Sequence, residues 1–293
     1  MLGFSALVAG SFALGSLMAN DIPPSVFTAL RFLLASFLMA GLALMTTGLP
    51  RSTFAAPWRY LLLGGIYVVY FVAMFEGLKT APAVSAAAVF TLTPVMSGIF
   101  GWLVLRQIAT KRMVLALAIG GLGALWVIFR ADWEVLRAFE IGQGELIYFL
   151  GCIPHALYPV LVVRLSRDKP SAAFSFAVVA SGAVMLTILA WPSVRTVDWA
   201  ALRPIVWVTL GYVSVFATAG SFVLLRIGAL RLPSATVMAY TYLTPSWVIL
   251  WEIALGKGAP SGIVLIGIGL TVVALLMLLR DEGQRPAFSK SRS

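Results

Sequence analysis

The feature that most constrains this chain is a short stretch that occurs twice, half a chain apart. The copies run from Pro82 to Pro94 (PAVSAAAVFTLTP) and from Pro233 to Pro245 (PSATVMAYTYLTP). Each begins with a proline inside an apolar region and ends with Leu-Thr-Pro. Interrupted apolar helices at matching places in two halves are typical of the binding sites of secondary transporters. The repeat therefore predicts a duplicated membrane protein.

The composition supports a membrane protein. Hydrophobic residues make up 61% of the chain and charged residues 11%, whereas a soluble domain carries about 25% charged residues. The net charge of +10 comes from Lys and Arg in short loops between apolar runs, which favours topology signals over nucleic-acid binding. The single cysteine, Cys152, excludes an internal disulfide. The expected partners are the lipid bilayer and a small-molecule substrate, with no nucleic acid.

Ten stretches have the apolar length, about 20 residues, that is needed to cross a membrane. The first has no basic residue before it, so we expect a retained span rather than a signal peptide. The predicted fold is an all-α integral membrane protein with ten transmembrane helices, at about 2–19, 25–46, 58–79, 82–105, 111–130, 143–165, 171–191, 204–226, 232–255 and 260–280.

The loop charges predict the orientation. If the N-terminus is cytoplasmic, about two-thirds of the Lys and Arg residues lie on the cytoplasmic side, as in most membrane proteins. Five spans in each half is an odd number, so the halves should have opposite orientations and form a 5+5 inverted repeat with both termini cytoplasmic. The predicted parts are a first repeat (1–130), a connecting loop (131–142), a second repeat (143–280) and a cytoplasmic tail (281–293).

Several motifs resemble the EamA family of the drug/metabolite transporter superfamily. They are Ile22-Pro-Pro followed by Ala29-Leu-Arg-Phe-Leu-Leu-Ala, the two Thr-Pro helices, and Glu252 in Trp-Glu-Ile-Ala-Leu-Gly. The resemblance covers nearly the whole chain in two halves. It implies a multi-pass protein of the bacterial cytoplasmic (inner) membrane that exports amino acids or other small metabolites, often driven by ion gradients.

His155, the only histidine, lies near the middle of the sixth stretch, in Pro154-His-Ala-Leu-Tyr-Pro159. Ionisable groups inside a membrane usually face a bundle interior or water. Because imidazole titrates near neutrality, His155 is a candidate both for substrate binding and for proton coupling; the alternative is a neutral core histidine. Tyr158 lies three residues on and shares its face. The flanking Pro154 and Pro159 predict an irregular helix and are candidate hinges.

Other candidate substrate-binding residues are aromatic or hydroxyl side chains near the middle of predicted spans. A buried phenol needs a polar partner, although aromatic stripes in membrane helices are often packing surfaces. These candidates are Tyr67, Tyr70, Phe71, Phe90, Thr91, Tyr212, Tyr240 and Thr241.

The two Thr-Pro pairs are candidate hinges. A proline inside a helix removes one backbone hydrogen bond, and the freed carbonyls, near Phe90 and Thr241, need new partners. Thr93 and Thr244 are candidates to supply these bonds locally. Pro94 and Pro245 are expected to face each other at the bilayer centre; the alternative is that each kink only shapes packing.

Glu76 and Glu252 lie near the predicted outer ends of their spans and are candidates for ion coupling, although both can simply reach the interface. Arg31 is given the same interfacial interpretation. We therefore expect no Lys or Arg at mid-membrane and a neutral, aromatic cavity. Such a cavity suits neutral or zwitterionic metabolites, with amino acids as the leading class.

Three functions remain open. The first is a secondary exporter working by alternating access around a central aromatic-lined cavity. The second is efflux of drugs or cationic compounds, which Glu76 or Glu252 in the cavity would favour. The third is an intramembrane enzyme with His155 as base and Ser181 or Ser221 as partner. The sequence lacks Walker A, zinc-protease and nucleophile-elbow motifs, so we expect no catalytic residues, cofactor or metal. A homodimer stays open, because glycines in the fifth and tenth spans permit close helix contacts.

Overall fold

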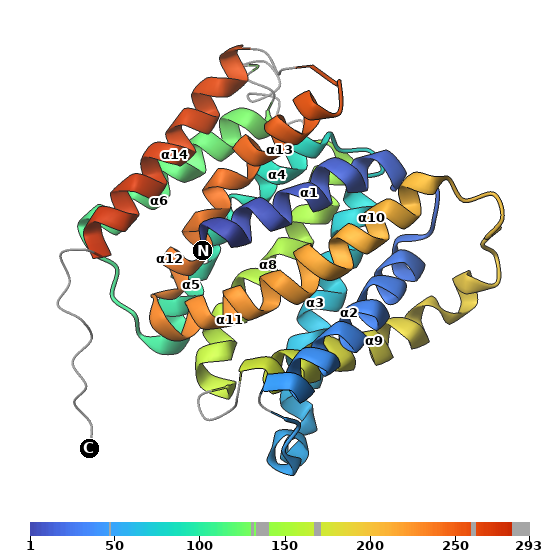
Figure 1. The fold of residues 1–293 in the computed structure, drawn as a ribbon. Coiled ribbons are helices and arrows are strands. Elements are labelled where there is room, and N and C mark those ends of the chain that lie inside the picture. The colour runs from blue at the N-terminus through green and yellow to red at the C-terminus, as the bar shows by residue number, and fades with distance from the viewer. Residues whose placement is uncertain (47, 130–131, 133–140, 167–170, 259–261, 283–293) are drawn as a thin grey trace.

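The computed structural model describes residues 1–46, 48–129, 132, 141–166, 171–258 and 262–282, and within these it contains helices but no strand (Figure 1). The predicted loop 131–142 and tail 281–293 lie largely outside the described residues. The first half contains α1 (Leu2–Met18), α2 (Pro24–Thr46), η1 (Arg51–Ala55), α3 (Pro57–Gly77), α4 (Ala83–Phe90), α5 (Thr93–Leu105) and α6 (Lys111–Ile128).

The second half contains α8 (Gln143–Leu165), α9 (Ser171–Val194), α10 (Pro204–Ser214), η2 (Val215–Gly220), α11 (Ser221–Arg231), α12 (Ser234–Ala239), η3 (Tyr240–Leu243), α13 (Thr244–Ala254) and α14 (Gly262–Glu282). Among the described residues, eight helical segments are long and apolar enough to span a membrane. The shorter α1 and the interrupted α12–α13 segment cover the two other predicted stretches. The described part of the chain is thus all-helical and has the long apolar helices of a multi-pass membrane protein, and the ten-span topology stays a prediction.

Both Thr-Pro stretches are interrupted, but the prolines do not lie inside a continuous helix as predicted. The first stretch breaks between Phe90 and Thr93, and the second passes through the 3₁₀ turn η3. Pro94 and Pro245 each stand in the first turn of the following helix. A proline fits there because its missing N–H would have no partner in the helix. The two interruptions are therefore short breaks between helices rather than kinks.

One other expectation about helix regularity was wrong, and one irregularity was not foreseen. α8 runs without a break through Pro154 and Pro159. The eighth predicted stretch, 204–226, extends to Arg231 and contains the π-helical segment η2 at its middle. Within η2, the Thr218 hydroxyl donates to the carbonyl of Val213 at 2.8 Å. A π-helical turn changes the spacing of side chains locally, and hydrophobic periodicity gives no signal for it.

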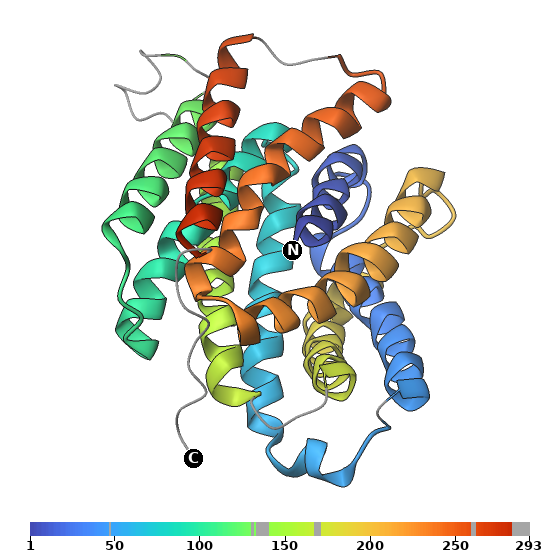
Figure 2. The same cartoon turned by 60° about the vertical axis from the view of Figure 1, so that its left-hand side comes forward.

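The helices pair mainly between the halves. α2 packs along α9, and α6 packs along α14, as Figures 1 and 2 both show. α1 packs against α10, η2 and α11, while α8 packs against α3. The first helix of each half thus packs against the third helix of the other half. The α6–α14 contact is close because Gly123 lies against the Gly267 carbonyl, where an added Cβ would come within 2.6 Å.

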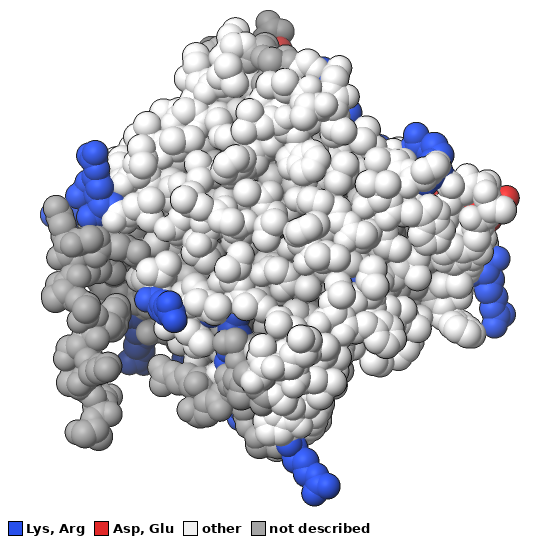
Figure 3. Space-filling model, viewed as in Figure 1, with Lys and Arg blue, Asp and Glu red and all other residues white. Residues whose placement is uncertain are grey.

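The described surface suits a lipid environment. Large apolar side chains such as Phe37 (76% exposed) and Ile188 point outward. In Figure 3 the broad centre of the visible face carries no charged side chain, and Lys and Arg lie toward its edges and lower part. At one end, Arg203 before α10 pairs with Asp21 after α1, with 2.7 Å between Nη2 and Oδ2. The Asp21 carboxylate accepts hydrogen bonds from Arg203 and raises the pKa of that guanidinium.

Candidate functional site

The interior holds a set of touching rings, here called the central aromatic cluster. Its members come from α1, α3, α4, α8 and α11, so both halves of the chain contribute. All of them are buried. They are Phe12, Tyr67, Tyr70, Phe71, Phe90, Tyr148, His155, Tyr158 and Phe222.

His155 contacts three rings of this cluster. Its ring stacks on Tyr70, with centroids 4.0 Å apart and an interplanar angle of 21°, and it also contacts Tyr67 and Phe90. It is 2% exposed, and among the described residues its Nδ1 atom has no hydrogen-bond partner. A buried polar nitrogen without a partner is costly, so this atom is suited to a ligand or a mobile proton.

Tyrosines surround His155 and link the helices. Tyr67 of α3 lies edge-on to Tyr158 of α8 at 4.5 Å, and its ring is 4.1 Å from that of Phe222 on α11. The Tyr70 and Tyr148 hydroxyls form a hydrogen bond of 2.9 Å. The candidates Tyr67, Tyr70, Phe71, Phe90, His155 and Tyr158 therefore lie together, packed against one another rather than around an open space.

α8 supplies one polar face of the cluster. Tyr148, His155 and Tyr158 follow at spacings of seven and three residues, which places them on one side of a helix. Glu145 precedes them on this side, buried, and its carboxylate accepts a hydrogen bond of 2.8 Å from Ser85 of α4. Sequence analysis did not select Glu145, which the structure places in the interior.

Arg31 is the main correction to the sequence analysis. It was expected at the interface, but its side chain is 0% exposed and lies inside the bundle. Its guanidinium carbon lies 3.7 Å from the centre of the Phe71 ring. The interior beside the cluster therefore holds a guanidinium, and the expectation of a neutral cavity without Lys or Arg is wrong at this point.

The two helix breaks lie next to each other. Thr93, at the start of α5, and Thr241, in η3, have hydroxyl oxygens 3.4 Å apart. The Thr93 hydroxyl donates to the freed carbonyl of Phe90 at 2.7 Å, as predicted. The Thr241 carbonyl instead accepts from the backbone N–H of Thr244, whose hydroxyl has no partner among the described residues. Thr91 donates its hydroxyl to Ala88 of its own helix.

Two of the predicted tyrosines lie apart from the cluster. Tyr212 on α10 is half-buried, donates to the Leu7 carbonyl at 3.0 Å and contacts Trp251. Tyr240 packs with a second group of apolar residues between α6, α12 and α14. Position near the middle of a span was the only reason to select them, and it does not fix which way a side chain points.

The two candidate coupling acids each have a basic neighbour. Glu76 pairs with Lys79 at 2.9 Å near the end of α3, and Glu252 lies 3.8 Å from Lys257 after α13. The Glu76 side chain is partly exposed. Neither acid contacts the central aromatic cluster in the described part of the chain, which fits the alternative that they lie at the interface.

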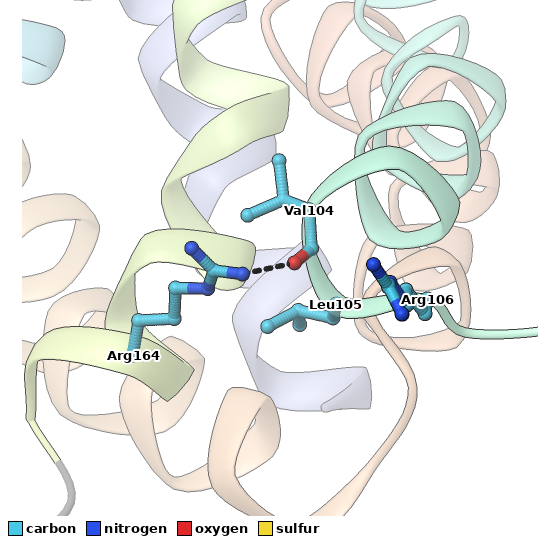
Figure 4. A pocket seen from close by; sticks show the side chains of 4 residues that line it. All are labelled: Val104, Leu105, Arg106 and Arg164. Carbon is cyan, nitrogen blue, oxygen red and sulfur yellow. Dashed lines mark hydrogen bonds between the residues drawn. The ribbon is translucent and has the colours of Figure 1, made fainter.

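A cavity of about 820 Å³ lies at one end of the bundle, between α5, α8, α11 and α12. Arg106, Gln107 and Arg231 are among its lining residues. A smaller cavity of about 370 Å³ adjoins it, and there Arg164 of α8 donates a hydrogen bond to the Val104 carbonyl of α5 (Figure 4). Both cavities lie on the side predicted to be cytoplasmic.

The comparisons with known proteins decide the family. The EamA-like transporter family matches residues 1–129 and 142–280. The chain belongs to the EamA-like transporter family. Two similar proteins of Bacillus subtilis (strain 168) are the uncharacterized transporters YyaM, 26% identical over 94% of this chain and 91% of that protein, and YetK, 21% identical over 97% and 86%.

A solved crystal structure has the same fold, with a TM-score of 0.75 and 21% identity over 97% of this chain and 98% of that chain. The family is one of transporters, as the resemblance implied, and a membrane-bound chain of this kind implies a small-molecule substrate. The Bacillus relatives suggest a bacterial membrane.

Proposed function

We propose that this EamA-family protein is a secondary active exporter of small zwitterionic or neutral metabolites, with amino acids as the leading class. It works by alternating access around the central aromatic cluster. Ten spans form a 5+5 inverted repeat in the cytoplasmic membrane, with both termini cytoplasmic. The repeats follow the predicted boundaries, 1–130 and 143–280.

One observation carries the proposal: a buried cluster of polar aromatic side chains lies among helices of both halves, close to their two helix breaks. α4 contributes Phe90 to the cluster, and the break that follows it meets η3 through Thr93 and Thr241. Rotation of one half against the other would separate helices that now meet in the cluster. The proposal therefore makes the packed cluster an occluded binding site.

The cavity at the end of the bundle supports a cytoplasmic entrance. Arg164 joins α8 to α5 beside this cavity, and α8 also carries His155. Opening this end would require loss of this hydrogen bond and separation of the other packed residues of α5 and α8. In the proposal, the breaks before Thr93-Pro94 and Thr244-Pro245 act as hinges for the movement.

The two alternative functions gain little from the structure. A carrier of cations would be favoured by an acid among the cluster rings. The buried acid on that side of α8, Glu145, accepts a hydrogen bond from Ser85, and the charged group that lies on a ring of the cluster is Arg31. An intramembrane enzyme would need a partner for His155. The Ser181 hydroxyl donates to the Tyr60 and Val178 carbonyls, and the Ser221 hydroxyl donates to the Ala217 carbonyl. Neither serine is hydrogen-bonded to His155 in the described structure.

Counterflow in proteoliposomes tests the transport proposal. Liposomes that contain the purified protein are loaded with the unlabelled amino acids of a panel. Uptake of the labelled amino acids is then measured with and without an imposed pH gradient. We expect saturable exchange by the wild type. His155→Gln should reduce it strongly, whereas Tyr212→Phe, outside the cluster, should retain most of it. If folded wild-type protein exchanges no amino acid, the amino-acid assignment is wrong.

The pH gradient separates two roles of His155. If His155→Gln retains exchange but loses the response to the gradient, then His155 carries a coupling proton. If exchange and the response are lost together while the melting temperature is unchanged, His155 binds substrate. Equal exchange by the variant and the wild type would remove His155 from the mechanism.

Single-cysteine labelling tests the topology. The native Cys152 is buried, so cysteines introduced at exposed positions can be labelled selectively. Arg51→Cys should react only with a reagent on the cytoplasmic side and Lys257→Cys only with a reagent outside. Labelling of both from one side would contradict the inverted 5+5 arrangement.

A further inference from the structure

We propose that Arg31 is the binding site for the carboxylate of the transported substrate. The inference rests on the proposed transport function and narrows it: the substrate must carry an anionic group. Arg31 then has a role that the sequence analysis did not assign to it.

The guanidinium of Arg31 has only neutral neighbours. Its Nε donates to the Thr218 hydroxyl at 2.5 Å, and its Nη2 donates to the Ala217 carbonyl at 3.1 Å. One face covers the Phe71 ring at 3.7 Å. The remaining nitrogen, Nη1, is buried and has no hydrogen-bond partner in the described part of the chain. Within the described residues, no carboxylate lies within the 4.0 Å of an ion pair.

Such an arrangement is costly for a structural residue. An arginine keeps its proton inside proteins, so it cannot become neutral when it is buried. A hydroxyl, a carbonyl and a ring orient dipoles toward the charge but do not neutralise it, and intramembrane charges are normally paired. The unpaired Nη1 adds the cost of an unmade hydrogen bond. An anion at Nη1 would supply both the missing charge and the missing acceptor.

The place of Arg31 in the fold connects it to the central aromatic cluster. Phe71, on which the guanidinium lies, stacks on Tyr67 at 5.6 Å and contacts Tyr70 at 4.7 Å. Both tyrosines touch His155. Arg31 is therefore one ring away from the tyrosines that surround the histidine. A zwitterion bound here can place its carboxylate at Arg31 and its side chain among the rings.

The residues that hold Arg31 lie in a specialised backbone segment. Thr218 and Ala217 belong to η2, the π-helical segment at the middle of the span from α10 to α11. π-Helical turns occur often at functional sites. Here the wider turn supplies a hydroxyl and a carbonyl to one guanidinium, and leaves Nη1 free. Arginine nitrogens recognise carboxylates and phosphates through charge-assisted hydrogen bonds, and the carboxylate is the anionic group that a zwitterionic metabolite carries.

Arg226 is a matched comparison for a structural role. It too is buried, and it lies over a phenylalanine ring, Phe174, at 4.8 Å. It lies at the middle of α11 and donates to the Ser166 carbonyl at 2.9 Å. If Arg31 and Arg226 both serve folding alone, substitutions at the two positions should have the same consequences for transport.

The test compares each transported amino acid with its methyl ester and its primary amide, in counterflow by wild-type protein, Arg31→Gln, Arg31→Lys and Arg226→Gln. We expect the wild type to prefer the carboxylate by about tenfold or more, as a charge-assisted hydrogen bond allows. Arg31→Gln should bring this ratio close to one while the ester is still exchanged. Arg31→Lys should keep part of the preference, and Arg226→Gln should keep all of it.

A wild type that exchanges esters and amides as well as carboxylates, or an Arg31→Gln variant with an unchanged ratio, would overturn the role of Arg31 and leave transport standing. Absence of exchange with any substrate would instead overturn the transport proposal, and this inference with it. The buffer is the other source of an anion for Arg31, and replacing its chloride by sulfate tests this source. If exchange then stops while the ratio stays near one, Arg31 binds an inorganic anion and the inference is wrong.

Discussion

The third helical segments of the two halves can be compared residue by residue, because the offset of 151 between the Thr-Pro copies continues into them. The first half has Tyr67, Tyr70 and Phe71 where the second half has Thr218, Ser221 and Phe222. On α3 the rings surround His155, whereas on η2 the small hydroxyl of Thr218 makes room for Arg31. Only the phenylalanine is kept, and Phe71 and Phe222 both contact Phe32.

This difference shows how a duplicated scaffold becomes an asymmetric site. Both halves keep a helix break, which preserves the possibility of movement. At the third helix one half provides aromatic surface, while the other provides a π-helical turn that holds a charge. A site for a zwitterion needs both kinds of surface, and a perfectly symmetric protein would offer the same surface twice.

The largest expected effect comes from a glycine of α3 at a close helix contact. The substitution replaces it by the residue type at the matching position of the second half. Gly64 matches Val215, which is exposed on η2. A Cβ at Gly64 would lie 2.8 Å from the backbone nitrogen of Gly182 and 2.9 Å from the Val178 carbonyl. Gly64→Val should therefore cost about 3 kcal/mol or more, which thermal unfolding in detergent would measure. Val215→Ala is the control and should change little; equal losses would show that the contact is not specific.

Tyr67→Thr also gives α3 the residue type of the matching position in the second half, Thr218, here inside the central aromatic cluster. It removes a ring that contacts Tyr158 and Phe222 at 4.5 and 4.1 Å, and truncation of a buried aromatic residue costs about 3 kcal/mol. We expect loss of counterflow together with a lower melting temperature. The control is Tyr212→Thr, which shortens a half-buried tyrosine outside the cluster. A Tyr67→Thr protein with wild-type exchange would exclude Tyr67 from the site.

Sequence reasoning found the helices and most of the cluster for the same physical reason. Crossing lipid requires long apolar segments, and polar side chains inside them stand out, so His155 and its tyrosines could be selected directly. Phe12, Tyr148 and Phe222 were missed because hydropathy does not show which face of an apolar helix is buried.

Arg31 was misplaced for a related reason. Its distance from the start of α2 fits an interfacial position, but the guanidinium is held inside by Thr218 and Ala217, which are more than 180 residues away along the chain. The π-helical turn that orients these two groups has no signature in hydrophobic periodicity. The polar contacts that decide the site are set by tertiary packing.

Thr218→Val sharpens the contrast between the halves by removing the hydroxyl that holds Arg31. A hydrogen bond to a charged group contributes about 2 kcal/mol, so we expect a loss of this size in thermal unfolding. The carboxylate preference should persist, because the charge remains. Thr209→Val is the matched control: this hydroxyl on α10 is buried without a hydrogen-bond partner among the described residues, so the change should be neutral or stabilising. Equal effects would show that the bond to Arg31 contributes nothing.

The smallest expected effect concerns Tyr70 and its counterpart Ser221. Tyr70→Phe breaks the bond to Tyr148 and should cost about 1 kcal/mol. Ser221→Ala removes only bonds to the Ala217 and Thr218 carbonyls in the preceding turn of the same span. In Tyr70→Phe the Tyr148 hydroxyl stays buried without that partner, so the further change Tyr148→Phe should cost less than Tyr148→Phe alone. A double-mutant cycle of melting free energies measures this coupling. Additive losses would mean that the two hydroxyls act independently, and that α3 and α8 are joined in the cluster by ring packing alone.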